Sequence, residues 1–157
     1  MSTDQCLFCG IVAGRIPATK VTEDDTTLTF MDINPGTEGH LLVIPKRHSK
    51  DLLDIPGEDL VAVTLSAQRI ARAIVNVLGA EGVNLLNCCR PEAWQTVFHF
   101  HMHVLPRYSD EAKDALVEPW QPGIPGDTET INRFGTKLAA VLQGSDVLAE
   151  GNDPIQP

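Results

Sequence analysis

The chain has no long apolar run and few basic residues for its length. None of its 157 residues lies in a stretch that approaches the roughly 20 apolar residues of a membrane-spanning helix. Residues 1–9 lack the basic start and the apolar core of a signal peptide. The 12 Lys and Arg are outnumbered by 21 Asp and Glu, and binding to a phosphate backbone needs clustered basic side chains. We therefore expect a cytoplasmic protein with neither a membrane nor a nucleic acid as its partner, in which a few directed groups hold any anionic ligand.

Cysteine is also scarce. The 4 cysteines stand in a chain without an export signal, so we do not expect them to form two disulfides. Cys6 and Cys9 form a Cys-x-x-Cys pair, the commonest half of a four-ligand zinc site, for which histidines can supply the other half. The alternatives are two buried structural thiols or a redox pair. A thioredoxin-like redox pair would stand in a strand-to-helix turn of a βαβ unit, which the sequence does not predict here.

The length and a hydrophobic content of 43% fit one domain. Apolar residues at helical spacing predict one long helix that opens at Pro56 and ends before Gly79. Shorter helices are predicted at residues 7–13 and 127–142. Apolar or β-branched runs predict strands that begin at Val21 and continue with residues 26–31, 41–44, 83–86 and 97–105. This order predicts an α+β fold with an antiparallel sheet of about five strands, one long helix and short helices. We expect residues 1–108 to form the domain and residues 109–157 a C-terminal helical extension packed on it, rather than a separate domain.

All 5 histidines lie in two short segments. His99, His101 and His103 alternate with apolar residues, so a strand would place the three imidazoles on one face. His99 and His103 would then be about 13 Å apart, too far to bind one metal ion together. The three side chains must therefore serve different roles. If His99 turns toward the cysteine pair, His48 is the available fourth ligand from a neighbouring strand or loop.

The run from His99 to Leu105 resembles the His-x-His-x-His-x-x signature of the histidine triad (HIT) family of nucleotide hydrolases and transferases. Further similarity covers about a hundred residues, in the segments Cys6–Cys9, Ile16–Pro17, Phe30–Ile33, Gly39–His48, Asn84–Asn87 and Gln95–Tyr108. The resemblance implies a HIT-like fold, a homodimer with one continuous sheet, and a nucleoside monophosphate pocket at the histidines.

The resemblance also implies a role for each histidine. His101 matches the nucleophile that attacks an α-phosphate and forms a nucleotidyl-histidine intermediate. His103 matches the histidine that hydrogen-bonds the phosphate and helps the leaving group, and it favours hydrolysis because the transferase branch carries Gln there. His40 matches a histidine that supports the nucleophile. In relatives with the same cysteine pair, the set that matches Cys6, Cys9, His48 and His99 holds one zinc ion. Four protein ligands leave no open position, so this zinc would be structural.

The same resemblance assigns the nucleotide pocket. Asp32 matches the acid that binds both ribose hydroxyls. Phe30 and Ile33 match positions near the base, although ordinary strand core is an equal alternative for them. The polar positions that line the phosphate match Asn87, Gln95 and Thr96. Trp94 departs from the family, which usually has a small Gly there, and a bulky indole beside the phosphate would restrict the leaving group or turn outward.

These residues predict a hydrolase that cleaves a nucleoside 5′-monophosphate, most simply AMP, from an amine, acyl or phosphate leaving group. A first alternative is a nucleotide-binding module with little turnover, suggested by Trp94. A second is a protein that stores or transfers metal ions through its histidines.

Overall fold

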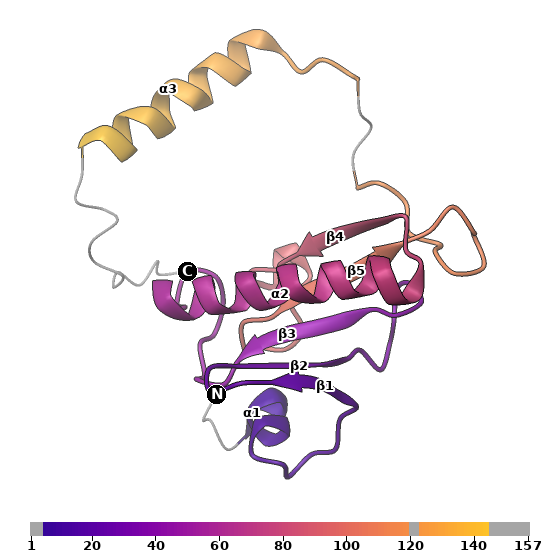
Figure 1. Cartoon of the computed structure of the whole chain (residues 1–157). Helices are drawn as coiled ribbons and strands as arrows, with labels where there is room; N and C mark the ends of the chain where they lie inside the picture. The colour runs from indigo at the N-terminus through magenta and orange to yellow at the C-terminus, as the bar shows by residue number, and fades with distance from the viewer. Residues whose placement is uncertain (1–4, 120–122, 145–157) are drawn as a thin grey trace. The chain divides into compact units, whose positions relative to one another are not determined.

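The computed structural model describes residues 5–119 and 123–144, and five antiparallel strands form its sheet (Figure 1). The strands lie in the order β1-β2-β3-β5-β4. Their bounds are Lys20–Glu23 for β1, Thr27–Met31 for β2, Leu41–Pro45 for β3, Gly82–Leu86 for β4 and Met102–Arg107 for β5. The α-helices are α1 at Leu7–Val12, α2 at Gly57–Leu78 and α3 at Thr128–Gly144, and η2 is a 3₁₀ turn at Pro91–Ala93. The predicted α+β class with a five-stranded antiparallel sheet is confirmed.

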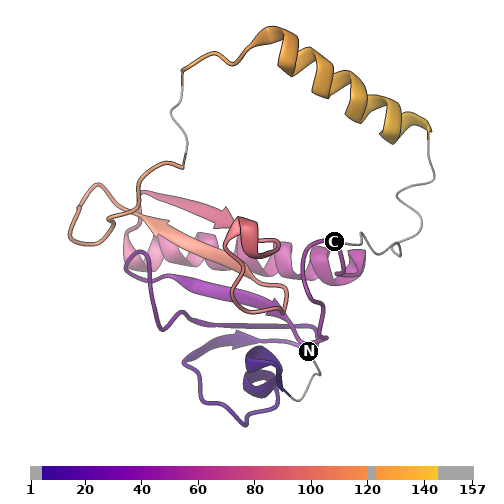
Figure 2. The ribbon, with the colours of Figure 1, turned by 180° about the vertical axis from the view of Figure 1, so that it is seen from behind.

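Helix α2 covers one face of the sheet (Figures 1 and 2). Pro56 precedes its first turn, Glu58 and Asp59 lie in that turn, and Gly79 ends it with a φ of 69°. Its buried side chains pack with those of the central strands. This cluster contains Val63, Ala67, Ile70, Ile74, Leu41, Val43, Phe100 and Val104. By length and composition alone, α2 is long and apolar enough to cross a membrane. This is weak evidence for a membrane span, because one face of the helix packs against the sheet.

Helix α1 packs on the opposite face of the sheet, against β2 and β3. Phe8 and Ile11 of this helix pack with β2 and β3, and the rings of Phe8 and Phe30 lie 5.5 Å apart edge to face. Leu42 of β3 belongs to this cluster and lies opposite His103 of β5. Because paired residues point to the same face of a sheet, the side chain of His103 lies on the α1 side.

The predicted strand at 97–105 is wrong at both ends, because β5 runs from Met102 to Arg107. Its pairing with β3 ends at the Val43–Met102 pair. Before that point the Phe100 N–H donates to the Ser49 carbonyl at 2.6 Å instead of to a ladder partner. Pro45 also favours the end of the β3–β5 pairing, because proline has no N–H to donate to a neighbouring strand. His99 and His101 therefore lie in a buried segment beside the sheet, and only His103 lies in the strand.

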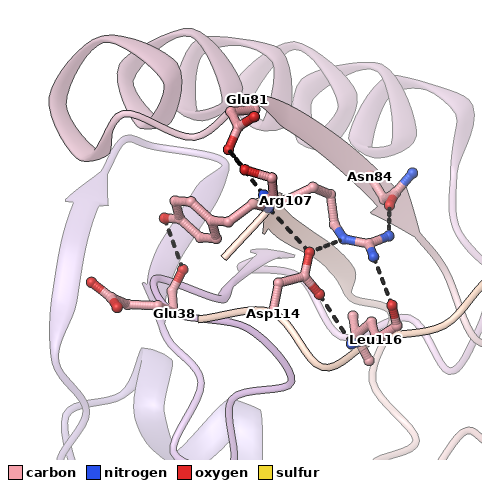
Figure 3. Close-up of polar contacts among 8 residues, drawn as sticks. Glu38, Glu81, Asn84, Arg107, Asp114 and Leu116 are labelled. Carbon is pink, nitrogen blue, oxygen red and sulfur yellow. Dashed lines mark hydrogen bonds and ion pairs between the residues drawn. The ribbon is translucent and has the colours of Figure 1, made fainter. Parts of the chain in front are cut away.

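Residues 109–116 fold back onto the ends of β4 and β5 (Figure 3). Arg107 Nε donates to Asp114 Oδ2 at 2.5 Å, Arg107 Nη1 donates to Asn84 Oδ1 at 2.6 Å, and Ser109 donates to Glu81. The chain divides into a first compact unit that runs to Leu116 and a second unit that begins at Val117. The domain boundary expected at residue 108 stays a prediction. Helix α3 of the second unit closely matches the predicted helix at 127–142. The packing of the extension on the domain stays a prediction.

Candidate metal centre and active site

Two cysteines and two histidines converge at the N-terminal end of α1. Cys6 caps this helix, and its Sγ accepts from the Cys9 N–H at 3.5 Å. Cys9 Sγ lies 3.3 Å from His48 Nδ1 and 3.5 Å from His99 Nδ1, and Cys6 Sγ lies 3.5 Å from His99 Nδ1. The four ligand atoms lie within 4.8 Å of one another. We call these four residues the cysteine–histidine cluster. None of the chain's cysteines, all of which lie among the described residues, is disulfide-bonded in this structure.

The donor set of this cluster fits a zinc ion. Zn–S bonds of about 2.3 Å and Zn–N bonds of about 2.0 Å in a tetrahedron place ligand atoms roughly 3.3 to 3.8 Å apart, which is the observed spacing of sulfur and nitrogen. His99 Nε2–H donates to the Pro45 carbonyl at 2.9 Å, which leaves Nδ1 as the ligand atom. Burial, opposed by this hydrogen bond, lowers the pKa of His99 to about 4 and keeps its imidazole neutral, as a metal ligand requires.

His101 is held in one tautomer with one nitrogen available. Its Nδ1–H donates to the His99 carbonyl at 2.7 Å. In the neutral ring, Nε2 therefore carries a lone pair and no proton. The side chain of Asn87 fixes the backbone here, because its Nδ2 donates to the His101 carbonyl at 2.9 Å. His101 is 4% exposed, and burial is the largest effect that lowers its pKa. A neutral imidazole with a free Nε2 lone pair is suited to nucleophilic attack.

The other two histidines form a directed hydrogen-bonded chain. The Gly36 N–H donates to His40 Nδ1 at 3.2 Å, so His40 carries its proton on Nε2. This Nε2 lies 2.9 Å from His103 Nδ1, which must then accept. His103 therefore bears its own proton on Nε2. The rings of His101 and His103 are 4.9 Å apart, so the series from Gly36 through His40 to His103, called here the histidine chain, ends beside His101.

The electrostatics of the histidine chain favour neutral rings. Burial lowers the pKa of His40, while the nearby Asp32 opposes this. Burial also lowers the pKa of His103 to about 4, with smaller contributions from His101 and His40. The structure places the His40 ring against His103, and its support of His101 stays a prediction.

Asp32 follows the last residue of β2 and lies next to the histidine chain. Its Oδ2 is 3.7 Å from His40 Nε2, and its Oδ1 accepts from the Asn34 N–H at 2.8 Å. Asp32, His40 and His103 offer a second group of three potential metal ligands. A metal at His40 Nε2 would have to displace the proton that Gly36 places there. The observed arrangement is that of a hydrogen-bonded chain.

The other residues predicted to bind the nucleotide differ in their placement. Phe30 is 4% exposed and belongs to the core, whereas Ile33 is 87% exposed. Gln95 is buried, and its side chain is fully engaged with backbone groups of Lys50, Arg90 and Val97. It holds the loop together and has no free group for a phosphate. Thr96 is exposed, and Asn87 keeps a buried Oδ1 without a hydrogen bond among the described residues.

The loop before the histidines is strained. Arg90 has φ 74° and ψ 163°, and Trp94 has φ 70°. They are the non-glycine residues with positive φ in the described ranges. Glycine adopts a positive φ without a steric penalty. The backbone at Trp94 therefore has a conformation typical of Gly, which is strained for a residue with a side chain. The indole is 68% exposed and is turned to solvent.

Sequence reasoning missed the groups that orient the imidazoles. Gly36 and Pro45 act through their backbones, to His40 and His99. Backbone donors and acceptors leave no trace in side-chain identity. The Asn34-Pro35-Gly36 turn was found, but its contact with His40 became visible only in the structure.

Comparisons with known proteins identify relatives of this chain. The HIT domain family matches residues 13–110. Adenosine 5′-monophosphoramidase HNT1 of Saccharomyces cerevisiae is 36% identical over 141 residues, which cover 90% of this chain and 85% of that protein. The crystal structure of a HIT family protein from Bacillus anthracis is similar with a TM-score of 0.78 and 37% identity, over 88% of this chain and 97% of that one. A zinc-bound histidine triad family protein from Mycobacterium smegmatis has a TM-score of 0.68 and 38% identity, over 91% and 99% of the two chains.

The family match covers well over half of the chain and contains both predicted histidine segments. The relatives share its fold at more than 30% identity. The chain therefore belongs to the HIT domain family.

Proposed function

We propose that this protein is a nucleotide hydrolase that cleaves AMP from an amine, acyl or phosphate leaving group through a nucleotidyl intermediate on His101. The observation that carries the proposal is the hydrogen bond of 2.7 Å from His101 Nδ1–H to the His99 carbonyl, since it leaves Nε2 unprotonated. The name of the yeast relative, an adenosine 5′-monophosphoramidase, supports an adenosine phosphoramidate as the simplest substrate.

In the first step, His101 Nε2 attacks the α-phosphorus, and the bond between phosphorus and the leaving group breaks. The electron pair of that bond goes to the leaving atom, to which His103 Nε2–H donates a hydrogen bond. An amine leaving group takes up a proton from a water molecule, and a hydroxide ion remains. In the second step, this hydroxide attacks the phosphorus; where the leaving group needs no proton, water attacks instead and releases one proton to solvent. The electron pair of the phosphorus–nitrogen bond returns to His101 Nε2, and AMP leaves.

Zinc in the cysteine–histidine cluster is a separate part of the proposal. Cys6, Cys9, His48 and His99 would fill its coordination shell, so the ion would tie α1 to the loop after β3 and to the histidine segment. A zinc-bound relative supports this assignment. The zinc would have a structural role, because four protein ligands leave no place for substrate or water.

A homodimer is the proposed assembly. Strand β4 is at the edge of the sheet, with Leu85 and Leu86 exposed. The neighbouring helix α2 exposes further apolar side chains, among them Val61, Leu65, Val75 and Val77. An apolar edge strand favours pairing with another strand, and β4 of a second copy would extend the sheet.

The two alternatives have weaker support. A binding module without turnover was suggested by Trp94, but its indole is exposed and does not fill the site. Metal storage draws on the second ligand group of Asp32, His40 and His103. The Gly36 N–H places the proton on His40 Nε2, so this group favours a hydrogen bond over a metal ion.

Denaturing mass spectrometry after rapid quenching tests the proposal. Wild-type protein mixed with an AMP–lysine phosphoramidate is expected to gain the mass of one nucleotidyl group and to release AMP. His101→Ala is expected to bind AMP in calorimetry but to form no adduct, which separates chemistry from binding. AMP binding to the wild type without adduct or AMP release would instead identify a nucleotide-binding module.

A further inference from the structure

Residues 110–116 lie against the loop that precedes His40. Thr37 and Asp114 form an isolated antiparallel bridge, and the Glu38 N–H donates to the Lys113 carbonyl at 2.8 Å. A Cβ added to Gly36 would lie 3.4 Å from Leu116 Cδ2. The segment therefore supports the loop at three successive residues, 36 to 38.

One ion pair fastens the 110–116 segment to the sheet, as Figure 3 shows. Asp114 Oδ2 accepts from Arg107 Nε at 2.5 Å and from the Tyr108 N–H at 3.1 Å, while Oδ1 accepts from the Leu116 N–H at 3.0 Å. Arg107 Nη2 donates to the Leu116 carbonyl at 2.9 Å. The Asp114 side chain is 2% exposed, so solvent weakens these bonds little. Tyr108 Oη also donates to the Glu38 carbonyl at 3.1 Å, which adds a second connection to the loop.

The supported loop supplies the donor that begins the histidine chain. With the Gly36 N–H on His40 Nδ1, His40 donates from Nε2, and His103 keeps its proton on Nε2. If this N–H moved away, His40 would be able to carry its proton on Nδ1 and accept at Nε2. His103 would then donate from Nδ1 and present a bare lone pair at Nε2. A small displacement at Gly36 would therefore convert His103 from a hydrogen-bond donor into an acceptor.

We propose that the 110–116 segment is a positioning element, fastened by the Arg107–Asp114 ion pair, which holds the Gly36 N–H on His40 and thereby keeps His103 as the Nε2–H donor for the leaving group. The effect on catalysis rests on the function proposed above, whereas the proton positions in the rings do not. Arg107, Asp114 and Gly36 act through His103, so they are positioning residues and not catalytic ones.

The first readout is the tautomer of each ring in the full-length protein. Long-range ¹H–¹⁵N spectra show which imidazole nitrogen bears the proton. Wild-type protein is expected to have the proton on Nε2 of both His40 and His103. In Asp114→Ala the His40 ring is expected to shift at least partly to the Nδ1–H form. Asp114→Asn, which keeps one acceptor oxygen, is expected to shift less.

The second readout is the dependence of turnover on the leaving group. Two AMP anilidates, one with a p-nitro and one with a p-methoxy substituent, differ in how much charge the leaving nitrogen must bear. A hydrogen bond to that nitrogen matters more for the poorer p-methoxy leaving group. Asp114→Ala is expected to lower kcat/KM for the p-methoxy substrate by about tenfold, the usual effect of losing one hydrogen bond to a charged group, and for the p-nitro substrate much less.

Glu81→Ala is the matched control. The side chain of Glu81 accepts two hydrogen bonds from Ser109 at the same end of the sheet, and neither bond involves the loop before His40. It is expected to change neither readout. Unchanged ring tautomers in folded Asp114→Ala, or equal losses on both anilidates, would overturn the inference. If the wild type hydrolysed neither anilidate, the proposed function would fail, while the spectra would still decide the proton positions.

Discussion

The cysteine–histidine cluster contains His99, and the histidine chain ends beside His101, only two residues further on, yet the two groups use the imidazole side chain for different purposes. In the cluster, the Nδ1 atoms of His48 and His99 point with two sulfurs to one centre. In the histidine chain, a directed hydrogen bond links the imidazole of His40 to that of His103. Convergent lone pairs favour a metal ion, whereas a series of donors and acceptors fixes tautomers.

The difference arises from the backbone partner of each ring. His99 donates from Nε2 to the Pro45 carbonyl and so presents Nδ1. His101 donates from Nδ1 to the His99 carbonyl and so presents Nε2. The position of one carbonyl acceptor thus decides whether a ring presents Nδ1, as the proposed metal ligand does, or Nε2, as the proposed nucleophile does. The identity of the residue alone does not distinguish them.

The largest expected effect separates the two groups by activity. His101→Ala should lower kcat by about 10³-fold or more, because the proposed reaction begins with attack by the Nε2 of this residue. Its zinc content should stay at one ion per chain. Steady-state hydrolysis and elemental analysis measure the two quantities. Loss of zinc together with activity would show that the two groups are not independent.

A second expected effect separates them by stability. Cys9→Ala should lose zinc and about 4 kcal/mol of unfolding free energy, the stabilisation given by a ligand present at a thousand times its Kd. Thermal unfolding with and without added zinc measures this loss. Cys89→Ala, which removes a half-buried cysteine outside the cluster, should keep both zinc and stability. An equal loss in both variants would show that the thiol serves packing and not metal binding.

The pH profile of activity is a third test, and it concerns His101. Burial lowers the pKa of His101 below its usual 6.5, so the neutral ring, the form required of the proposed nucleophile, is present at pH 7. The neutral ring is lost only as the pH falls through this lowered pKa. A plot of kcat/KM against pH should thus be level near neutrality and should decline on the acid side with a midpoint below 6.5. A midpoint above 6.5 would contradict a neutral, buried nucleophile.

The smallest expected effect concerns the strained loop, which belongs to neither group. Trp94→Gly and Trp94→Ala both remove an indole that is 68% exposed, but only Gly accommodates a φ of 70° without penalty. The Gly variant should be more stable than the Ala variant by about 1 kcal/mol. Both should keep kcat/KM within about threefold of the wild type. A large loss of activity in both variants would give the indole a role in substrate binding.

Local pattern predicted most of the fold. Acids before an apolar helical stripe and Gly79 after it defined α2, and β-branched runs defined β2 and β3. The start of β5 could not be predicted, because it depends on a long-range bond from Phe100 to Ser49. Nor could the ion pair between Arg107 and the buried carboxylate of Asp114, which fastens residues 110–116 to the sheet.

The candidate site was partly visible in the sequence. Period-two spacing limited how many of the triad histidines one metal could bind, and the two cysteines suggested the other ligands. Gln95 was assigned to the phosphate because of its position, but its buried amide is engaged by three backbone groups. Such engagement depends on how the loop folds. The tautomers of His40 and His103 likewise depend on a backbone N–H that carries no sequence signal.

Native mass spectrometry of the protein mixed with an AMP phosphoramidate and rapidly quenched tests the division of roles most directly, because it weighs zinc and nucleotide on the same molecule. The account predicts one zinc ion and one nucleotidyl group on the same wild-type chain, and one zinc ion without a nucleotidyl group on His101→Ala. Chains that carry a nucleotidyl group only after losing zinc, or that bind a second zinc and form no adduct, would contradict it.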